Sequence, residues 1–279
     1  MEGGHRIDLV RHRVSPALDG LVAGVVGLSE RAPGVVRRRQ PAGTLLPLVF
    51  SFGNPLTIGP VADAAGAASY ESFLAGLSSS PATTQFEDGQ DCVQVYLTPI
   101  GARRILGVPG SQVAGRVLAV RDVGPRTDGY LTERLRGATT WTERFDLVER
   151  VLLQQLEREV GAPAWVGWMW SQIAQSGGRV RIRDLVDRTG WSHRYVTTVF
   201  AEEIGLTPKR AAGIVRFERA AADLGRFPLA EIAARRGYAD QSHLARDVAR
   251  YAGETPSELA AAQRPTAWTA LGPLARTRR

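Results

Sequence analysis

Two stretches of the sequence repeat one pattern and decide the fold of the C-terminal half. Residues 181–210 read RIRDLVDRTGWSHRYVTTVFAEEIGLTPKR, and residues 228–259 read PLAEIAARRGYADQSHLARDVARYAGETPSEL. The turn Gly190-Trp191 in the first copy matches Gly237-Tyr238 in the second, and each copy then reaches a Gly-x-Thr-Pro sequence. Each copy predicts a short amphipathic helix, a glycine-aromatic turn, a polar N-cap and a second amphipathic helix. This is the layout of a helix-turn-helix unit, present twice.

The second helix of each copy has an apolar face and a polar face. Ser192 and Asp240 are the expected N-caps, because their side chains can accept hydrogen bonds from the free N–H groups of the first helical turn. Apolar residues recur at helical spacing and are expected in the core: Val196, Val199 and Phe200 in the first copy, and Leu244 and Val248 in the second. The residues expected to be exposed are Arg194, Thr197 and Thr198 in the first copy, and Gln241, Ser242, Ala245 and Arg246 in the second.

The polar faces of these two helices offer guanidinium, amide and hydroxyl groups. These groups read base edges in a major groove, since arginine fits guanine, glutamine fits adenine and a threonine methyl fits thymine. The alternative is a plain helical bundle with solvated polar faces. Two copies with matching turns favour the DNA-reading interpretation.

The net positive charge lies in the same half as the repeat. The chain has 279 residues and a net charge of +7. Residues 1–160 contain 17 arginines and 17 acidic residues, whereas residues 161–279 contain 17 arginines and one lysine against 11 acidic residues. A neutral first part joined to a basic second part favours a polyanion-binding module, with solubility charge as the alternative.

Residues 178–259 resemble the two-motif DNA-binding domain of the AraC/XylS family of bacterial transcription regulators. The most diagnostic stretch is GYADQSHLARD at residues 237–247. Thr207-Pro208-Lys209, followed by residues 216–220, resembles the long linker helix between the motifs. Val248 departs from the family, which usually has phenylalanine there, and this smaller residue is expected to loosen the second motif.

The resemblance implies a cytoplasmic, nucleoid-associated transcription regulator, more commonly an activator in this family, that binds double-stranded operator DNA and works with RNA polymerase. Both second helices are expected to enter successive major grooves, about 34 Å apart. His193 and His243 are expected near the DNA or the core, not at a metal. The expected DNA-binding set is Ser192, His193, Arg194, Thr197, Thr198, Asp240, Gln241, Ser242, Ala245 and Arg246.

Residues 1–160 predict a small, mainly antiparallel β domain with helices. Residues 45–52 and 92–98 are the strongest expected strands, and residues 21–27 and 72–77 are weaker ones. Residues 142–159 then predict an amphipathic helix. Its apolar stripe either packs on its own sheet or pairs with a symmetry mate in a homodimer. The stripe consists of Phe145, Val148, Leu152 and Leu156.

The first part also resembles the N-terminal regions of actinobacterial members of the family, which implies a sensing or dimerising domain with a compact, cupin-like β fold. The stretches that carry this resemblance are residues 39–44, 52–55, 72–77, 93–99 and 106–109. We hypothesise that this domain binds a small effector, which changes how the two motifs meet DNA. Aromatic residues could line its pocket or be ordinary core: Phe50, Phe52, Tyr70, Phe73 and Tyr96. Residues 37–39, three arginines, are expected in a solvated loop, with binding of an anionic effector as the alternative.

The expected architecture is therefore α+β, with two domains and a tail. Residues 1–160 form the sensing or dimerisation domain, residues 164–262 the double helix-turn-helix domain, and residues 263–279 a flexible tail. The boundary is placed at Gly161-Ala162-Pro163, which stops the preceding helix.

The remaining residues argue against several other classes of protein. One cysteine, Cys92, cannot form an intramolecular disulfide or a multi-cysteine metal site, and the four histidines are scattered. No metal or cofactor is expected. No membrane span is expected either, since no apolar run approaches the ~18 residues that a span needs. Enzymatic methyl transfer on a cysteine, known in fused relatives of this DNA-binding domain, is the weak alternative. The second alternative is an architectural or RNA-binding protein.

Overall fold

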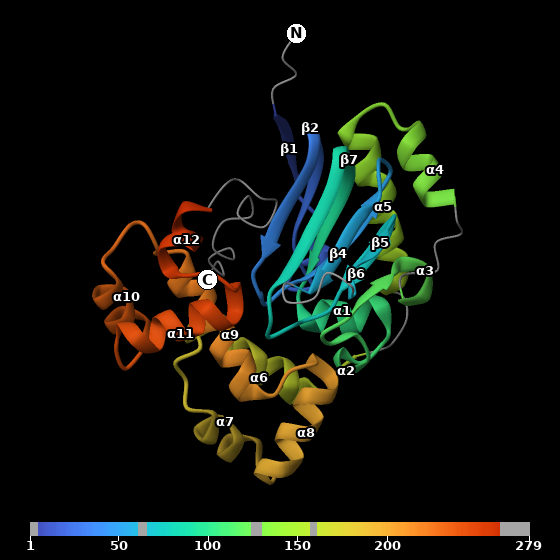
Figure 1. Cartoon of the computed structure of the whole chain (residues 1–279). Helices are drawn as coiled ribbons and strands as arrows, with labels where there is room; N and C mark the ends of the chain where they lie inside the picture. Colours follow the sequence, from blue (N-terminus) through green and yellow to red (C-terminus); the bar gives the residue numbers. More distant parts are fainter. Residues whose placement is uncertain (1–4, 61–65, 124–129, 157–160, 263–279) are drawn as a thin grey trace.

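The computed structural model describes residues 5–60, 66–123, 130–156 and 161–262, and joins an antiparallel sheet to a helical C-terminal region (Figure 1). The expected tail at residues 263–279 lies outside the described residues. The strands are β1 (Arg6–His12), β2 (Val22–Gln40), β3 (Leu46–Ser51), β4 (Leu56–Pro60), β5 (Ala68–Tyr70), β6 (Ser72–Ala75), β7 (Ala82–Leu97) and β8 (Val117–Ala119). The helices of the first part are the short 3-10 helix Pro16–Leu18, α1 (Pro99–Leu106), α2 (Gly110–Val113), α3 (Val120–Val123), α4 (Tyr130–Gly137) and α5 (Trp141–Leu156).

The two longest strands, β2 and β7, form the centre of the sheet. They pair antiparallel from Val22 opposite Leu97 to Gln40 opposite Ala82, with a bulge between Arg31 and Val35. The strand order is β1-β2-β7-β3-β6-β8, and β4 pairs with the first half of β7 and with β5. Because β7 is long enough to pair with β3 along one half and β4 along the other, it holds the sheet together.

The expected strands at 45–52 and 72–77 correspond to β3 and β6. Those at 92–98 and 21–27 are the ends of longer strands, β7 and β2. The three arginines at 37–39 lie within β2, so the expectation of a loop there was wrong. Their side chains alternate, with the middle one half-buried and its neighbours exposed, as on any strand.

Helix α5 covers one face of the sheet with its apolar stripe. Phe145, Val148 and Leu152 are buried in the same core as Val93 and Val95 of β7. His12 of β1 approaches Glu149 of α5 at 2.5 Å, which adds a polar contact between strand and helix. The stripe therefore packs on its own sheet, and the alternative of a symmetry mate on this stripe was wrong.

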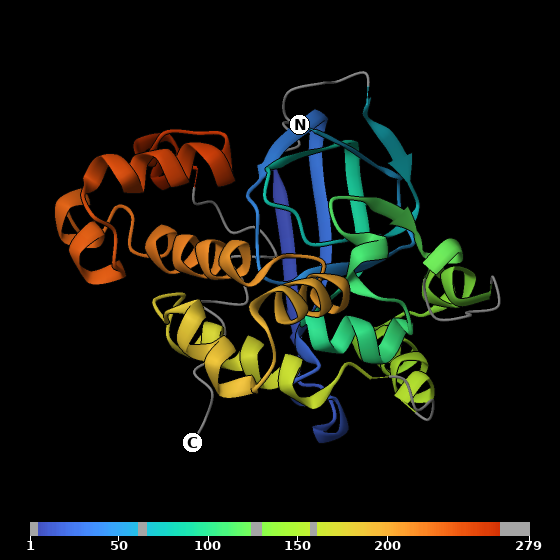
Figure 2. The ribbon, with the colours of Figure 1, turned by 90° about the horizontal axis from the view of Figure 1, so that it is seen from below.

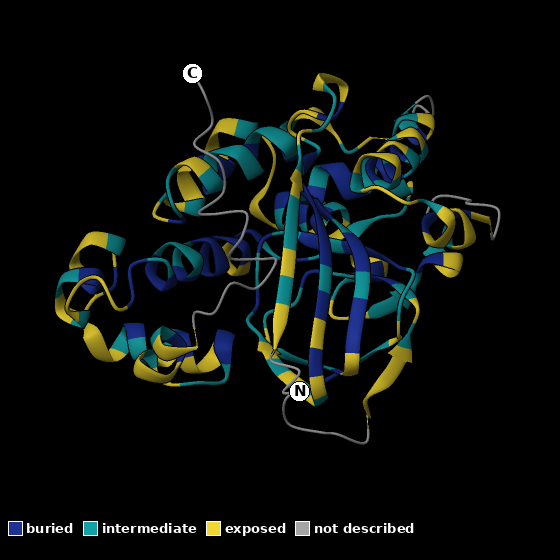
Figure 3. Ribbon diagram, turned by 90° about the horizontal axis from the view of Figure 1, so that it is seen from above, coloured by how far each residue is buried: buried dark blue, intermediate teal, exposed yellow. Residues whose placement is uncertain are grey.

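The C-terminal region consists of seven helices among the described residues. They are α6 (Ala164–Gln175), α7 (Ile182–Thr189), α8 (His193–Ile204), α9 (Pro208–Ala221), α10 (Leu229–Arg236), α11 (Gln241–Ala252) and α12 (Pro256–Ala261). Figure 2 shows α9 running from the centre of the molecule to the lobe formed by α10, α11 and α12. Nine of its 14 residues are buried, so it appears largely blue in Figure 3. No helix within the described ranges has the length and apolar character that a membrane crossing requires.

The first helix-turn-helix unit packs directly on the N-terminal part. Helix α2 lies against the end of α8, and a Cβ atom on Gly110 would lie 2.3 Å from the carbonyl carbon of Ile204. Arg103 of α1 donates from Nε to Glu203 of α8 at 2.8 Å. One apolar core runs from Leu97 of β7 to Phe200 of α8, so the two parts share their interior.

The second helix-turn-helix unit is held by the last residues of β2 and the turn that leads to β3. We call residues 39–44 the docking segment. Arg39 donates from Nη1 to the carbonyl of Gly253 at 2.9 Å. The Ala42 N–H donates to the carbonyl of Tyr251, in the last turn of α11, at 2.8 Å. These bonds tie the end of α11 to the C-terminal end of β2 and the turn that follows it.

The docking segment also reaches the linker helix through a carboxyl group. Thr44 donates from its N–H and its hydroxyl to the two oxygens of Glu218 in α9, at 2.8 and 2.6 Å. Although Glu218 as a residue keeps partial exposure, its carboxyl end is enclosed by protein. This burial raises the pKa of Glu218 to about 7, against the lowering effect of the hydrogen bonds from Thr44.

The contact at Gly110 predicts that a single methyl group weakens the docking of the first unit. Gly110→Ala forces backbone to move and is expected to lower the free energy of unfolding by about 1–3 kcal/mol. Gly137→Ala is the matched control, because no atom lies within 4 Å of a Cβ there. Urea titration measures the free energy of unfolding of both variants. Equal stability of the two variants would contradict the close packing of α2 on α8.

The contact at Glu218 predicts a pH-dependent stability. Between pH about 5 and 7 the folded chain retains a proton that the unfolded chain has released, so its stability falls as pH rises, by up to about 1.4 kcal/mol per pH unit. Glu218→Gln can still bond to Thr44 and should remove this slope. Chemical unfolding at a series of pH values measures it, with Glu202→Gln, an exposed carboxyl on α8, as the control. If the free energy of unfolding changed with pH in the same way for wild type and Glu218→Gln, Glu218 would not be the source of the pH dependence.

Candidate nucleic-acid interface and ligand cavity

The turn of each helix-turn-helix unit begins with a glycine in the left-handed backbone conformation. Helices α7 and α10 end at Gly190 and Gly237, with φ of +74° and +76°. Glycine occupies this left-handed conformation without steric cost, and it reverses the chain at the end of a helix. The repeated glycine-aromatic pair in the sequence therefore places two similar turns, which set the directions of α8 and α11.

Polar caps start both of the helices that follow the turns. The Ser192 hydroxyl accepts from the Tyr195 N–H at 3.3 Å. The Asp240 carboxylate accepts from the His243 N–H at 2.7 Å. Both expected N-caps are confirmed. A cap of this kind satisfies one of the free N–H groups of the first turn.

The apolar faces of α8 and α11 are packed as expected. Val196, Phe200, Leu244 and Val248 are fully buried. Val199 is half-buried. The valine at 248, where the family usually has phenylalanine, thus still belongs to the core. The packed faces fix which side of each helix is turned outward.

The expected DNA-binding residues lie on the outward sides of these two helices or at their starts. Those on α8 and its cap that are exposed are Ser192, His193, Arg194 and Thr198, while Thr197 is half-buried. Those on α11 and its cap that are exposed are Asp240, Gln241, Ser242 and Arg246, while Ala245 is half-buried. The structure thus gathers the predicted residues into two groups, one on each unit, shown as separate lobes in Figure 1.

Other arginines of this region hold the helices together. Arg216 of α9 lies over the Tyr238 ring, with its guanidinium carbon 4.8 Å from the centroid, and approaches Asp247 of α11 at 3.5 Å. Arg236 of α10 pairs with Asp223 at 2.6 Å. Part of the basic charge of the C-terminal half therefore has a structural role.

Two exposed aromatic residues at the start of α8 were not among the predicted site residues. Trp191 and Tyr195 are 55% and 44% exposed, and their ring centroids are 5.0 Å apart. The sequence placed Trp191 in the turn between the two helices of the unit, and most of its side chain is open to solvent there. Its place immediately before the Ser192 cap is the signal that could have marked it.

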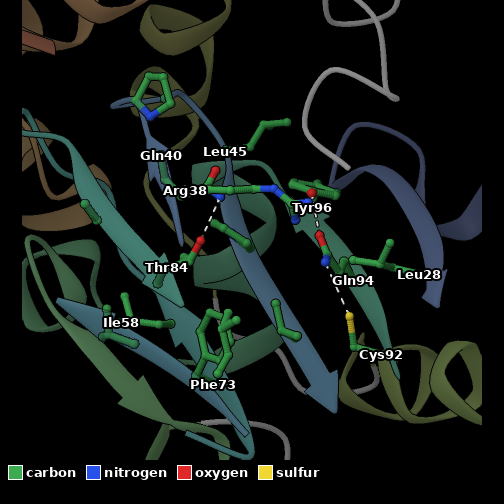
Figure 4. Close-up of a pocket in the computed structure, with 18 of the residues that line it drawn as sticks. Leu28, Arg38, Gln40, Leu45, Ile58, Phe73, Thr84, Cys92, Gln94 and Tyr96 are labelled. Carbon is green, nitrogen blue, oxygen red and sulfur yellow. Dashed lines mark hydrogen bonds between the residues drawn. The ribbon is translucent and has the colours of Figure 1, made fainter. Parts of the chain in front are cut away.

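The N-terminal sheet curves around a cavity of about 200 Å³ on the face opposite α5 (Figure 4). Strands β1, β2, β3, β4, β6, β7 and β8 all contribute lining residues. On β7, Val93 and Val95 point to the helices, whereas Cys92, Gln94 and Tyr96 line the cavity, as strand alternation requires. The sequence placed Val93, Val95 and Leu97 on one side, but it did not show that the other side faces a cavity.

Of the five aromatic residues considered for a pocket, two line the cavity. Phe73 and Tyr96 are among its lining residues. Phe50 is buried in the core on the helical face. Phe52 packs against that core beside Trp141, and Tyr70 packs against Phe73 outside the lining.

Two oppositely charged side chains, Glu30 and Arg38, line the cavity and bind each other. Arg38 donates from Nη1 and Nη2 to the two carboxylate oxygens of Glu30. Glu30 also accepts from Gln90 Nε2 at 2.8 Å and contacts His5 Nε2. Burial alone would raise the pKa of Glu30, but the bonds from Arg38, His5 and Gln90 outweigh it and hold this pKa below its ordinary value. Arg38, which was expected in a loop, thus forms a partly buried ion pair.

The single cysteine lies in the cavity wall. Cys92 is 2% exposed, and burial raises the pKa of its thiol to about 12. A thiol in this state is protonated at neutral pH and is a poor nucleophile. Among the described residues, no cluster of three or more His, Cys, Asp or Glu side chains is placed to hold a metal ion.

The cavity and the docking segment share residues that the sequence analysis did not single out as site residues. Gln40, Pro41, Ala42 and Gly43 line the cavity and lie within residues 39–44. Their contacts with α11 and α9 join residues far apart in the chain, such as Thr44 and Glu218. No local sequence pattern marks such pairs.

Comparison with known proteins assigns the C-terminal region and the fold. A family described as a helix-turn-helix domain matches residues 185–262. The solved structure of ToxT from Vibrio cholerae is similar over 93% of this chain and 98% of its own, with 8% identity and a TM-score of 0.50. The C-terminal domain of AraT, a response regulator from Geobacillus stearothermophilus, is 21% identical over 38% of this chain and 92% of its own, with a TM-score of 0.34. Comparison with curated proteins gives no significant sequence match.

The matched domain coincides with the two repeated units described above, and the ToxT likeness extends over the sheet as well. The α+β architecture expected from the sequence is confirmed. Residues 185–262 therefore form a helix-turn-helix domain, and its two-unit layout and the stretch at residues 237–247 support the resemblance to the AraC/XylS family of DNA-binding transcription regulators.

Proposed function

We propose that α8 and α11 read two successive major grooves of one specific DNA site, under the control of a small effector bound by the N-terminal domain. The observation that carries this proposal is the repeated construction of the two helices. Each is capped at its start and packed on its apolar side, and each exposes polar side chains on the other. This is the construction of a recognition helix, whose first turns contact base edges.

The side chains on the two helices differ in what they can read. Arg194 and Arg246 are exposed and, among the described residues, form no ion pair, in contrast to Arg216 and Arg236. Arg246 donates only from Nε, to the carbonyl of Ser242 at 3.2 Å, among the hydrogen bonds found in the described residues. A guanidinium without an ion pair fits the two acceptors of guanine, and the amide of Gln241 fits adenine. We assign base contacts to these residues and to Thr197, Thr198 and Ser242. We assign contacts with the phosphates to Ser192 and His193 and an apolar contact to Ala245, while Asp240 acts at the DNA-facing start of α11 by capping the helix.

Effector control is supported by the position of the docking segment. Residues 40–43 form part of the cavity wall, and Ala42 and Thr44 bond to α11 and α9. A ligand that shifts this wall would change the energy of these bonds and hence the placement of the second unit. Linkage then requires that DNA binding changes ligand affinity by the same factor.

The family resemblance extends the proposal to activation through contact with RNA polymerase in the bacterial cytoplasm. A homodimer, if formed, would use a surface other than the apolar stripe of α5, which is packed on the sheet. The proposed domain boundaries are those expected from the sequence, with α6 beginning the DNA-binding domain at Ala164.

The proposed reading mode predicts the form of the DNA site. Selection from fragmented genomic DNA with the full-length chain should enrich sites with two specific segments about 10 base pairs apart, bound at least ~10³-fold more tightly than random DNA. Titrations across a salt series separate specific affinity from phosphate attraction. Equal affinity for all sequences, falling steeply with salt, would instead favour an architectural DNA-binding protein.

The assignment of Arg246 predicts a local loss of specificity. Arg246→Ala should cost about 1–3 kcal/mol at one base position of the selected site and accept other bases there. Arg150→Ala removes the same charge from the exposed side of α5 and should leave binding unchanged. Competition binding against single-base variants of the site measures both. A uniform loss on every sequence would make Arg246 a phosphate contact.

A further inference from the structure

The cavity of the N-terminal sheet has the size and lining of a site for a small, mainly apolar molecule. Its volume is about 200 Å³, somewhat larger than the ~150 Å³ engineered cavity that admits benzene. Leu28, Val49, Ile58 and Phe73 contribute apolar surface from four different strands. The space therefore suits one aromatic ring with a short substituent.

The charged groups of the cavity disfavour a charged ligand. Glu30 and Arg38 are the ionisable acid and base that line it, and they neutralise each other. The acceptor positions of Glu30 are already taken by Arg38, Gln90 and His5. An anionic ligand would meet the fully buried carboxylate of Glu30, and a cationic one would meet the partly buried guanidinium of Arg38, so either would have to disrupt this pair, which is unfavourable.

One neutral polar group in the wall has a poor partner. Gln94 accepts the Tyr96 hydroxyl at 2.6 Å, but its amide nitrogen faces the sulfur of Cys92 at 3.3 Å (Figure 4). A protonated thiol is a weak acceptor, whereas a hydroxyl or carbonyl oxygen is a good one. The Gln94 amide is thus a donor in the cavity wall that a ligand oxygen would satisfy better than its present partner does.

We propose that this cavity binds an uncharged, mainly apolar molecule about the size of a substituted aromatic ring, which presents a hydroxyl or carbonyl oxygen to Gln94. The proposal names the ligand class for the effector control proposed above, and rests on it for its biological meaning. Binding itself depends only on the cavity, so the two can be tested separately.

Three probes with one carbon skeleton test the role of charge. 3-Phenylpropan-1-ol, 3-phenylpropanoate and 3-phenylpropylammonium are titrated to about 5 mM against the full-length chain by calorimetry, because ligands of this size bind in the micromolar to millimolar range. The alcohol should bind at least about tenfold more tightly than either ion. Tighter binding of an ion, or no binding of any probe, would overturn the proposal.

Two variants test the role of Gln94. Gln94→Leu should weaken the alcohol about tenfold but leave propylbenzene, which has no oxygen, at wild-type affinity or better. Gln85→Leu is the matched control, since Gln85 lies on the same strand, outside the cavity lining, and bonds to Arg37. Loss of both compounds on Gln94→Leu, with a native circular dichroism spectrum, would show that the side chain supports the wall and does not recognise the oxygen.

DNA affinity is measured in parallel, with the alcohol present and absent. Binding of the alcohol without any change in DNA affinity would contradict effector control and leave the assigned ligand class standing. Specific DNA binding by a chain that binds none of the probes would contradict the ligand class alone.

Discussion

The burial of the linker helix α9 is the constraint on which the rest of the C-terminal region depends. This helix contacts α6, α8, α10, α11 and α12, and it also receives Thr44 from the sheet. Where a neighbouring helix approaches such a helix most closely, the side chains between them must be short. Its run of small residues, Ala211, Ala212 and Gly213, meets this demand. The relative placement of the two reading helices follows from how each packs against α9.

The docking segment adds a second restraint, and this one comes from the N-terminal part. Arg39 and Ala42 bond to backbone carbonyls at the end of α11, and Thr44 bonds to a buried carboxyl of α9. Hydrogen bonds of this kind contribute modestly to net stability but are costly to leave broken when buried. These hydrogen bonds hold the second helix-turn-helix unit in place, whereas the first unit is held by the packing of α8 against α1 and α2. The second unit is therefore the one whose position a change in the sheet can most readily alter.

The C-terminal region was predictable because its signals are local. The caps Ser192 and Asp240, the turn glycines and the apolar spacing of α8 and α11 each follow from a few neighbouring residues. The sheet was predicted less well, since strand β1 alternates charged with apolar residues and the second half of β2 contains Pro33-Gly34 and three consecutive arginines, so that both resemble loops when read alone. Arg38 is such a residue, and only its pairing with Glu30 explains why a guanidinium lies inside a strand. Contacts such as Thr44 with Glu218 depend on the final fold and leave no trace in the local sequence.

The shared apolar core limits how far this protein can be treated as two exchangeable modules. Because the interior passes without a break from β7 to α8, a chimera joined near residues 161–163 would cut through packed side chains. A foreign sensor would have to present a glycine-sized gap to the end of α8, where Gly110 lies, and a donor to the carboxyl of Glu218. Regulators with new ligand preferences are thus more accessible by altering the cavity lining of this chain than by replacing its N-terminal half.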